Sequence, residues 1–197
     1  GKYSLEKLGG DIVTTVDASR IVDELASEKG GRVYRTKVGD VNVAEKMEEE
    51  KIMFGGEPSG TWIIGDIHMC PDGTLAAARI IEMIDFYKSK LSNLVESIPK
   101  YPIARSKIEC RNEKKSIIME KLEDILPSKF KNIDNIGTLD GIRLELESGD
   151  WVLIRPSGTE PYIRITSEAE KEKKARKMVK KTEGLLKKIK SNNLNLH

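Results

Sequence analysis

The chain has 197 residues, 38% of them hydrophobic, and its 34 basic and 32 acidic residues leave a formal net charge of only +2. This length allows one large domain or two small ones, and the balanced charge gives no global field for nucleic acid or an anionic membrane. Any anion site must therefore be local. Cys70 and Cys110 are too few for a disulfide framework or a structural zinc site, and no apolar run reaches signal-peptide or membrane-spanning length. We therefore predict a cytoplasmic protein that binds neither nucleic acid nor membrane.

The first half of the chain alternates predicted strands and helices. A β-branched run at 11–16 predicts a buried strand, and the apolar spacing after it predicts a helix that Asp17 caps and Gly30 ends. The alternation then repeats, which predicts an α/β domain with a largely parallel sheet. The further predicted elements are a strand at 32–36, a helix at 41–50, strands at 51–56 and 61–64, and a long helix at 73–87.

Pro99 and Pro102 mark a predicted linker, because neither proline permits a helix to continue. We therefore place the domain boundary here, with domains at 1–97 and 98–197. Strands clustered between two helices predict that the second domain is α+β with an antiparallel sheet. Its predicted elements are a strand at 103–110, a helix at 113–126, a hairpin of 141–147 with 151–155, a strand at 162–166 and a helix at 168–190.

The stretch RPSGTEP, which begins at Arg155 and lies between two predicted strands, has the residue types of a phosphate-binding loop. Arg155 offers a planar fork of N–H donors, Ser157 and Thr159 add hydroxyl groups, and Gly158 leaves the backbone N–H groups accessible. The loop is not a P-loop, because the G-K-[ST] ending is absent and a strand follows. The alternative is an ordinary polar turn in which Arg155 pairs with Glu160.

A second polar loop, FGGEPSGTW, follows the third predicted strand and contains Glu57 and Ser59, while KVGD, with Lys37 and Asp40, follows the second. Because the carboxyl ends of parallel strands share one edge of a sheet, we expect these side chains on one rim. A carboxylate beside hydroxyl groups suits a polyol, since Glu57 can accept hydrogen bonds from two adjacent sugar hydroxyls. The alternative is a tight glycine turn in which Glu57 caps or pairs locally.

The motifs RTKVGD, GGEPSG and RPSGTEP, in this order and spacing, resemble the C-terminal half of the α-D-phosphohexomutases. This is the family of phosphoglucomutase, phosphomannomutase and phosphoglucosamine mutase. The resemblance covers essentially the whole chain, including the helix DGTLAAARIIEMI, and implies the third and fourth of four domains around a deep cleft. The third would be the family's α/β domain and the fourth its TATA-binding-protein-like α+β domain. The opening GKYSLEKLGG, which reads as the middle of a helix, favours a fragment.

The resemblance also implies roles for the residues of the three motifs. Glu57, Ser59 and Thr61 would contact the sugar, with Lys37 and Asp40 close by. Many members of the family have histidine where Thr61 stands, a difference that bears on sugar preference. The residues that would hold the substrate's non-reacting phosphate are Arg155, Ser157, Gly158 and Thr159.

The expected activity depends on residues that the chain lacks. The family's phosphoserine segment, like T-A-S-H-N-P, and its Mg²⁺ loop, D-G-D-G-D-R, are absent, so we expect no catalytic residue and no metal ligand here. The resemblance implies that the intact protein interconverts hexose 1- and 6-phosphates through a phosphoserine and a sugar bisphosphate, as phosphomannomutase or phosphoglucomutase does. The missing N-terminal domains would supply the serine and bind Mg²⁺, and the fragment alone would be inactive. The alternatives are a phosphoglucosamine mutase fragment and a non-catalytic phosphosugar-binding module.

Two further segments have other interpretations. His68 and Cys70 in HMCPD suggest a metal, but His197 is the one other histidine and no second cysteine is near, which argues against zinc. The last helix carries ten Lys or Arg between Lys171 and Lys190. Its apolar spacing predicts an amphipathic helix with a solvated basic face, since no aromatic residues accompany the charge as in nucleic-acid sites.

Overall fold

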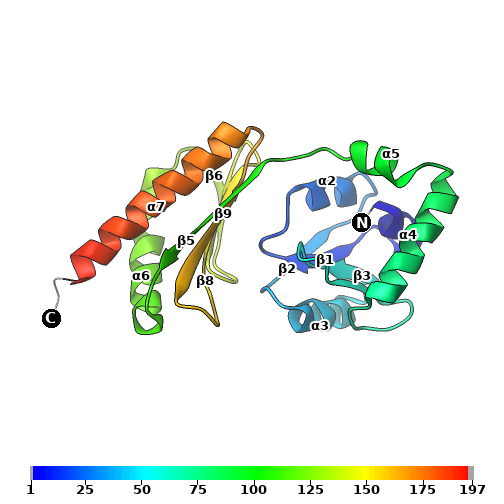
Figure 1. Cartoon of the computed structure of the whole chain (residues 1–197), viewed down its shortest axis with the longest axis horizontal. Coiled ribbons are helices and arrows are strands. Elements are labelled where there is room, and N and C mark those ends of the chain that lie inside the picture. The colour runs from blue at the N-terminus through cyan, green and yellow to red at the C-terminus, as the bar shows by residue number, and fades with distance from the viewer. Residues whose placement is uncertain (1, 195–197) are drawn as a thin grey trace. The chain divides into compact units, whose positions relative to one another are not determined.

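A computed structural model gives the structure of residues 2–194, with side chains described as far as Ser191. The chain divides between Lys100 and Tyr101 into two compact parts, which we call unit 1 and unit 2 and describe separately (Figure 1). Within the described range, no helix is both long enough and apolar enough to cross a membrane.

Unit 1 contains a four-stranded sheet of order β2-β1-β3-β4. β1 (Ile12–Thr15) pairs in parallel with β2 (Val33–Thr36) and with β3 (Phe54–Gly56), whereas β4 (Trp62–Ile64) runs antiparallel to β3. The predicted α/β domain with a largely parallel sheet is therefore confirmed. The helices of unit 1 are α1 (Lys2–Leu8), α2 (Ile21–Ser27), α3 (Asp40–Glu50), α4 (Gly73–Tyr87) and α5 (Leu91–Glu96).

The sheet of unit 1 is covered on both faces, so its central strand β1 is buried on both sides. Successive side chains of a strand point to opposite faces, and each face has its own core. Ile12 and Ile64 pack with residues of α1 and α2. Val13 and Ile63 pack with Val43 and the other buried residues of α3.

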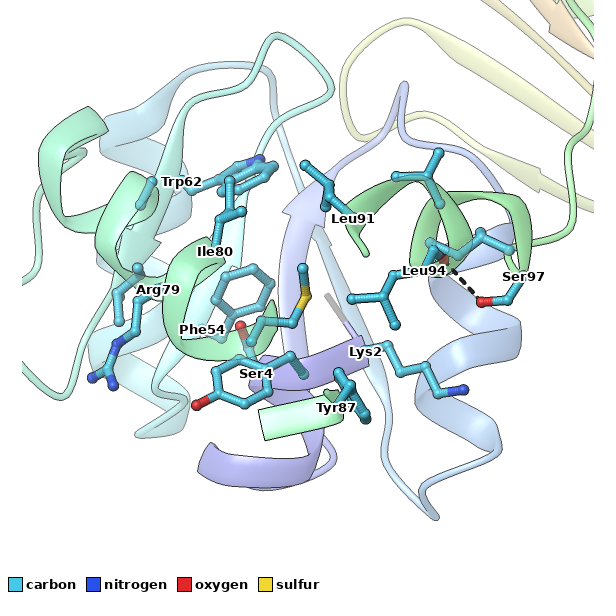
Figure 2. A pocket seen from close by; sticks show the side chains of 16 residues that line it. Lys2, Ser4, Phe54, Trp62, Arg79, Ile80, Tyr87, Leu91, Leu94 and Ser97 are labelled. Carbon is cyan, nitrogen blue, oxygen red and sulfur yellow. Dashed lines mark hydrogen bonds between the residues drawn. The ribbon is translucent and has the colours of Figure 1, made fainter. Parts of the chain in front are cut away.

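A cavity of about 350 Å³ lies among α1, α4, α5 and the sheet of unit 1 (Figure 2). Its walls are mostly apolar, with Phe54 and Ile64 from the sheet and Ile80 and Met83 from α4. None of the nine predicted sugar- or phosphate-contacting residues lines it. We therefore assign it no part in the predicted site.

The prediction that Asp17 caps α2 is wrong. The helix begins at Ile21, and Asp17 instead accepts a hydrogen bond of 2.6 Å from the Thr15 hydroxyl. The physical reason is Arg35 of β2, whose guanidinium donates to the carbonyls of Thr15 and Ala18 at 3.1 and 3.2 Å. These bonds hold the segment after β1 as a loop, so the helix starts later than its residue types suggest.

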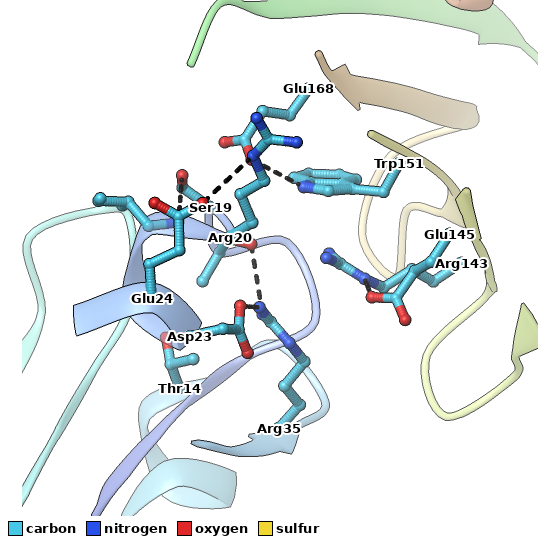
Figure 3. Close-up of polar contacts among 12 residues, drawn as sticks. Thr14, Ser19, Arg20, Asp23, Glu24, Arg35, Arg143, Glu145, Trp151 and Glu168 are labelled. Carbon is cyan, nitrogen blue, oxygen red and sulfur yellow. Dashed lines mark hydrogen bonds and ion pairs between the residues drawn. The ribbon is translucent and has the colours of Figure 1, made fainter. Parts of the chain in front are cut away.

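The same guanidinium anchors the first turn of α2, as Figure 3 shows. Arg35 donates through its second terminal nitrogen to Asp23 at 2.6 Å. At the other end of the helix, Gly30 has a φ of 68° in the turn that follows Ser27, as its predicted role requires.

Unit 2 contains a five-stranded antiparallel sheet of order β5-β9-β8-β7-β6. The predicted α+β domain with an antiparallel sheet, and the hairpin within it, are therefore confirmed. One strand, β6, was not predicted. The elements are β5 (Ile103–Glu109), α6 (Asn112–Ile125), a 3₁₀ turn (Pro127–Lys129), β6 (Ile133–Gly137), β7 (Ile142–Leu146), β8 (Trp151–Pro156), β9 (Tyr162–Glu168) and α7 (Glu172–Leu194).

Helices α6 and α7 cover one face of this sheet (Figure 1). Val152 and Ile154 of β8 point to that face and pack with Leu122 of α6 and Leu186 of α7. The predicted amphipathic character of α7 is confirmed, because its apolar positions are buried while most of its basic side chains are exposed. The side chains at odd-numbered positions of β8, which include Arg155, point to the opposite face of the sheet.

Candidate functional site

The loop Glu57–Thr61 connects β3 to β4 and closes on itself. The Glu57 N–H donates to the Thr61 carbonyl at 2.9 Å, and the Gly60 N–H donates to the Glu57 carbonyl at 3.1 Å. Gly60 has a φ of 94°, a conformation that favours glycine at this tight turn. The Ser59 hydroxyl donates to Glu57 Oε2 at 3.1 Å and lies 3.1 Å from Thr61 Oγ1. The turn thus gathers the three predicted sugar-contacting side chains into one polar cluster.

The KVGD loop after β2 meets this cluster through its backbone. Glu57 Oε1 accepts a hydrogen bond of 2.5 Å from the Gly39 N–H, at the start of α3. The helix N-terminus favours the negative charge of the carboxylate. Lys37 and Asp40 lie at the two ends of the KVGD loop and are exposed, and Asp40 Oδ1 accepts from the Val41 N–H at 3.0 Å. The two loops therefore lie on one rim and are joined by the hydrogen bond between Gly39 and Glu57.

The local bonds of Glu57 leave it capable of binding a ligand. Each carboxylate oxygen carries two acceptor sites, and the contacts with Gly39 and Ser59 occupy one on each oxygen. A cavity of about 220 Å³ lies beside the loop, with Glu57 and Pro58 at its rim and Thr14 and Ser19 among its polar walls. Ser59 and Thr61 do not line this cavity.

The RPSGTEP loop of unit 2 connects β8 to β9 and is held by its own hydrogen bonds. Ser157 is 6% exposed; its N–H donates to the Tyr162 carbonyl at 2.9 Å, and its hydroxyl accepts from the Glu160 N–H at 3.2 Å. Gly158 and Thr159 stand exposed at the tip, and a Cβ built on Gly158 would meet no atom within 4 Å. Ser157 therefore stabilises the conformation of the loop, while Gly158 and Thr159 form its exposed tip.

Lys115 of α6, which the sequence analysis missed, lies beneath this loop. Its buried ammonium donates to the carbonyls of Ser157 at 2.5 Å and Glu160 at 2.6 Å. Because the C=O and N–H of a trans peptide point in opposite directions, the Gly158 N–H is directed away from Lys115. The loop therefore has a buried positive charge below it and a backbone donor aimed outward. The signal was present, since Lys115 falls on the same helical stripe as Ile118 and Leu122, where a lysine is unexpected.

Arg155 pairs with Asp140 and not with Glu160, so the alternative of a simple polar turn is wrong in this respect. The Arg155 Nε lies 2.7 Å from Asp140 Oδ2, and Glu160 pairs instead with Arg164 of β9. Gly141 makes the contact possible, because a Cβ at this position would lie 2.2 Å from the Ile154 carbonyl oxygen. The turn before β7 can thus approach β8 closely and hold the guanidinium from one side.

A second polar cluster shares the sheet face with Arg155. The Trp151 indole N–H donates to Glu168 Oε1 at 3.0 Å, and the guanidinium of Arg143 lies 4.1 Å from the centroid of the indole ring (Figure 3). Arg143 also pairs with Glu145 at 2.7 Å. Cation–π stacking and charged hydrogen bonds of this kind fix side chains at a sheet surface. The sequence predicts Arg143, Glu145 and Trp151 only as strand positions, and the prediction that the last helix begins at Glu168 is wrong, because Glu168 ends β9 and α7 begins at Glu172.

No metal site is formed by the side chains of residues 2–191. They contain no group of three or more His, Cys, Asp or Glu placed to hold an ion. His197, named above in connection with zinc, lies outside the described residues.

The nine predicted residues fall into two sets, one in each unit, and known families match the units separately. Residues 1–101 match the family described as phosphoglucomutase/phosphomannomutase, alpha/beta/alpha domain III, and residues 106–184 match that described as phosphoglucomutase/phosphomannomutase, C-terminal domain. A probable phosphoglucosamine mutase of Methanothermobacter thermautotrophicus is 50% identical over 183 residues, covering 93% of this chain and 40% of that protein.

Solved structures of the same kind share the fold. A phosphoglucomutase/phosphomannomutase family protein of Burkholderia thailandensis has a TM-score of 0.81 at 25% identity and covers 96% of this chain and 40% of that chain. N-acetylphosphoglucosamine mutase of Aspergillus fumigatus, in complex with GlcNAc-6P and magnesium, has a TM-score of 0.65 at 12% identity and covers 92% and 42%. This chain thus spans about 40% of the length of these relatives. It belongs to the phosphoglucomutase/phosphomannomutase family and contains the third domain and the C-terminal domain of that family.

Proposed function

We propose that this chain is the substrate-binding part of a phosphosugar mutase that acts on a hexosamine phosphate. Unit 1 holds the sugar through the cluster around Glu57, and unit 2 holds the phosphate that does not react. The observation that carries the proposal is the buried Lys115 under the RPSGTEP loop, which gives that loop the charge and backbone direction of an anion site. The name of the Methanothermobacter relative favours the phosphoglucosamine alternative over the phosphomannomutase or phosphoglucomutase type.

The sugar site must accept one substrate in two opposite orientations, because both ends of the sugar exchange phosphate in turn. The second acceptor sites of the Glu57 carboxylate can take two adjacent hydroxyls either way round, and the Ser59 and Thr61 hydroxyls can donate or accept. The exposed Lys37 and Asp40 stand on the same rim and would contact the ring substituents.

The proposed phosphate site combines the forked guanidinium of Arg155, the Gly158 backbone N–H and the buried positive charge of Lys115. Asp140 holds the Nε side of Arg155, and the two terminal nitrogens form the fork that matches phosphate oxygens. The Gly158 N–H and the Thr159 hydroxyl lie at the exposed tip. The Ser157 hydroxyl accepts a hydrogen bond from the Glu160 N–H and keeps its own proton, which it can donate to a phosphate oxygen.

Chemistry would be performed outside this chain. Phosphoryl transfer depends on positioning and on stabilising charge at the moving group, a task that Mg²⁺ supplies when bound. Residues 2–191 contain no group of three or more His, Cys, Asp or Glu placed to hold an ion, and the chain covers 40% of its Methanothermobacter relative. We therefore assign the Mg²⁺ ligands and the phosphoserine to other domains of the intact protein. The residues described above would keep the sugar bisphosphate intermediate bound while it exchanges its reacting end.

The purified 197-residue chain should bind glucosamine 6-phosphate and glucosamine 1-phosphate without interconverting them. Calorimetry would measure the binding, and ³¹P NMR of the same mixtures would follow turnover. Measurable interconversion would refute the assignment of catalysis to other domains. Absence of binding to either phosphosugar would refute the proposed function itself.

Replacing Arg155 by Ala should weaken phosphosugar binding by about 1.5–3 kcal/mol, roughly 10- to 150-fold in Kd, because a charged hydrogen-bonding partner of the phosphate is lost. Inorganic phosphate should weaken to a similar extent when titrated by calorimetry. Arg176→Ala, which removes an exposed guanidinium paired with Glu172 on α7, is the matched control and should leave both affinities unchanged. An unchanged affinity in Arg155→Ala would remove this residue from the site.

Glu57→Gln should weaken phosphosugar binding about tenfold while leaving the affinity for inorganic phosphate unaltered. The amide keeps the size of the side chain, but its nitrogen cannot accept hydrogen bonds, so one of the contacts with Gly39 and Ser59 is lost along with the charge. Glu48→Gln on the exposed face of α3 controls for the loss of one charge. A parallel loss of inorganic phosphate binding would contradict a role confined to the sugar.

Lys115→Met should reduce the affinity for inorganic phosphate and for phosphosugar about tenfold each, because the methionine fills the same space without orienting the loop carbonyls. The salt dependence of phosphate binding should also fall, a change that partial unfolding would not produce. Lys114→Met, one residue earlier on α6, is the control. Equal affinities and salt dependence in Lys115→Met and the wild type would show that Lys115 only stabilises unit 2.

A further inference from the structure

The segment between β4 and α4 carries a hydrogen-bonded chain of three side chains that the proposed function does not use. Cys70 Sγ lies 3.1 Å from His68 Nδ1, and His68 Nε2 lies 3.2 Å from Asp72 Oδ2. Cys70 is exposed, and the side chains of His68 and Asp72 are 34% and 37% exposed. A thiol, a base and a carboxylate are thus connected in sequence at the protein surface.

The carboxylate at the end of this chain is fixed by the fold. Asp72 is the N-cap of α4, and its Oδ1 accepts from the Leu75 N–H at 2.9 Å while its Oδ2 faces His68. The Leu75 bond, and to a smaller degree His68, hold the pKa of Asp72 below its usual value, so it is ionised at neutral pH. With Oδ1 committed to the helix, Oδ2 remains in place to orient the imidazole.

The backbone around Cys70 is also held in place. Pro71 forms a β-bridge with Ile63 of β4, next to the Asp72 N–H, which donates to the Trp62 carbonyl at 3.4 Å. The other charged group of the segment, Asp66, is paired with Arg79 of α4 and balanced by it. The charge that faces the imidazole from the helix is therefore that of Asp72.

The three side chains stand in the sequence that activates a nucleophile, namely the thiol, its base and the group that orients the base. A thiol becomes reactive as the thiolate, which an adjacent base favours, and a third group that orients the base completes the set. The start of the 15-residue helix α4 further favours negative charge nearby. Cys110 is the contrast within the same chain, because it is 2% exposed and burial raises the pKa of its thiol.

We propose that Cys70 is a reactive thiol, with His68 as its base and Asp72 as the residue that positions His68, and that it exchanges with low-molecular-weight disulfides. In this reaction the Cys70 proton passes to His68 and the thiolate attacks one sulfur of the small disulfide. A new S–S bond forms to Cys70 as the old one breaks. The departing thiolate takes the proton from His68, so the small disulfide is the oxidant and one small thiol is the reduced product.

The test is the rate at which iodoacetamide alkylates Cys70 in the full chain, with mass spectrometry to separate it from Cys110. At pH 6, where an ordinary thiol is less than about 1% ionised, the wild type should react about tenfold faster than His68→Gln. Asp72→Asn, which retains a good N-cap residue, should react at an intermediate rate. At pH 10, where cysteine thiols are largely ionised, the rates of all three should converge within about twofold.

Equal rates at pH 6 would overturn the proposal, and so would a difference that persists at pH 10, because that would reflect accessibility of Cys70 and not activation. A second measurement uses oxidised glutathione as the small disulfide. The wild type should form a mixed disulfide at Cys70 faster than His68→Gln, and Cys70→Ser should form none at this position. Mixed-disulfide formation at equal rates in wild type and His68→Gln would exclude His68 as the base.

Discussion

The hydrogen bonds of the Lys115 ammonium are the interactions on which the conformation of the RPSGTEP loop depends. A buried lysine needs hydrogen-bond acceptors, and the Ser157 and Glu160 carbonyls provide them. The loop must turn these carbonyls inward to satisfy Lys115, and the N–H after Ser157 is turned outward by the planarity of the peptide. The direction of the loop's donors therefore follows from one side chain on a different element, which explains why the loop sequence by itself left a polar turn as an alternative.

Glu57 holds a loop in place in unit 1 as Lys115 does in unit 2, but through a negative charge. Its carboxylate joins the loop after β3 to the N-terminus of α3, the helix that follows β2, and β2 and β3 flank β1 on opposite sides. Sheet topology brings the loops to one edge, but it does not fix their separation. The hydrogen bond from the Gly39 N–H to Glu57 fixes this separation. Placing the carboxylate there is favourable, because the N-terminus of a helix attracts negative charge. The residue proposed to bind the sugar is thus also the one that holds its own rim together.

The elements that the sequence predicted correctly are those with a clear apolar pattern, such as the continuous β-branched run of β1 and the helical apolar spacing of α7. The strand β6 was missed because NIDNIG is mostly polar, its pairing with β7 is irregular at Ile133, and Ile136 is 37% exposed. The loop residues of the site were predicted as chemical types and as motifs. Their partners, Lys115, Asp140 and Gly39, were not, because each contact joins residues far apart in the chain and depends on tertiary packing.

In the proposed function, charge separates sugar binding from phosphate binding more sharply than hydroxyl recognition could. A phosphate is a multiply charged anion, and the rim of unit 1 carries the two carboxylates of Glu57 and Asp40 against one ammonium, that of Lys37. In unit 2 the nearest partners of Lys115 are neutral carbonyls, so its positive charge remains uncompensated by these contacts, unlike that of Arg155 beside Asp140. In the proposed function, this contrast assigns the phosphate to unit 2 and leaves the hydroxyl contacts of unit 1 free to accept the sugar in both orientations.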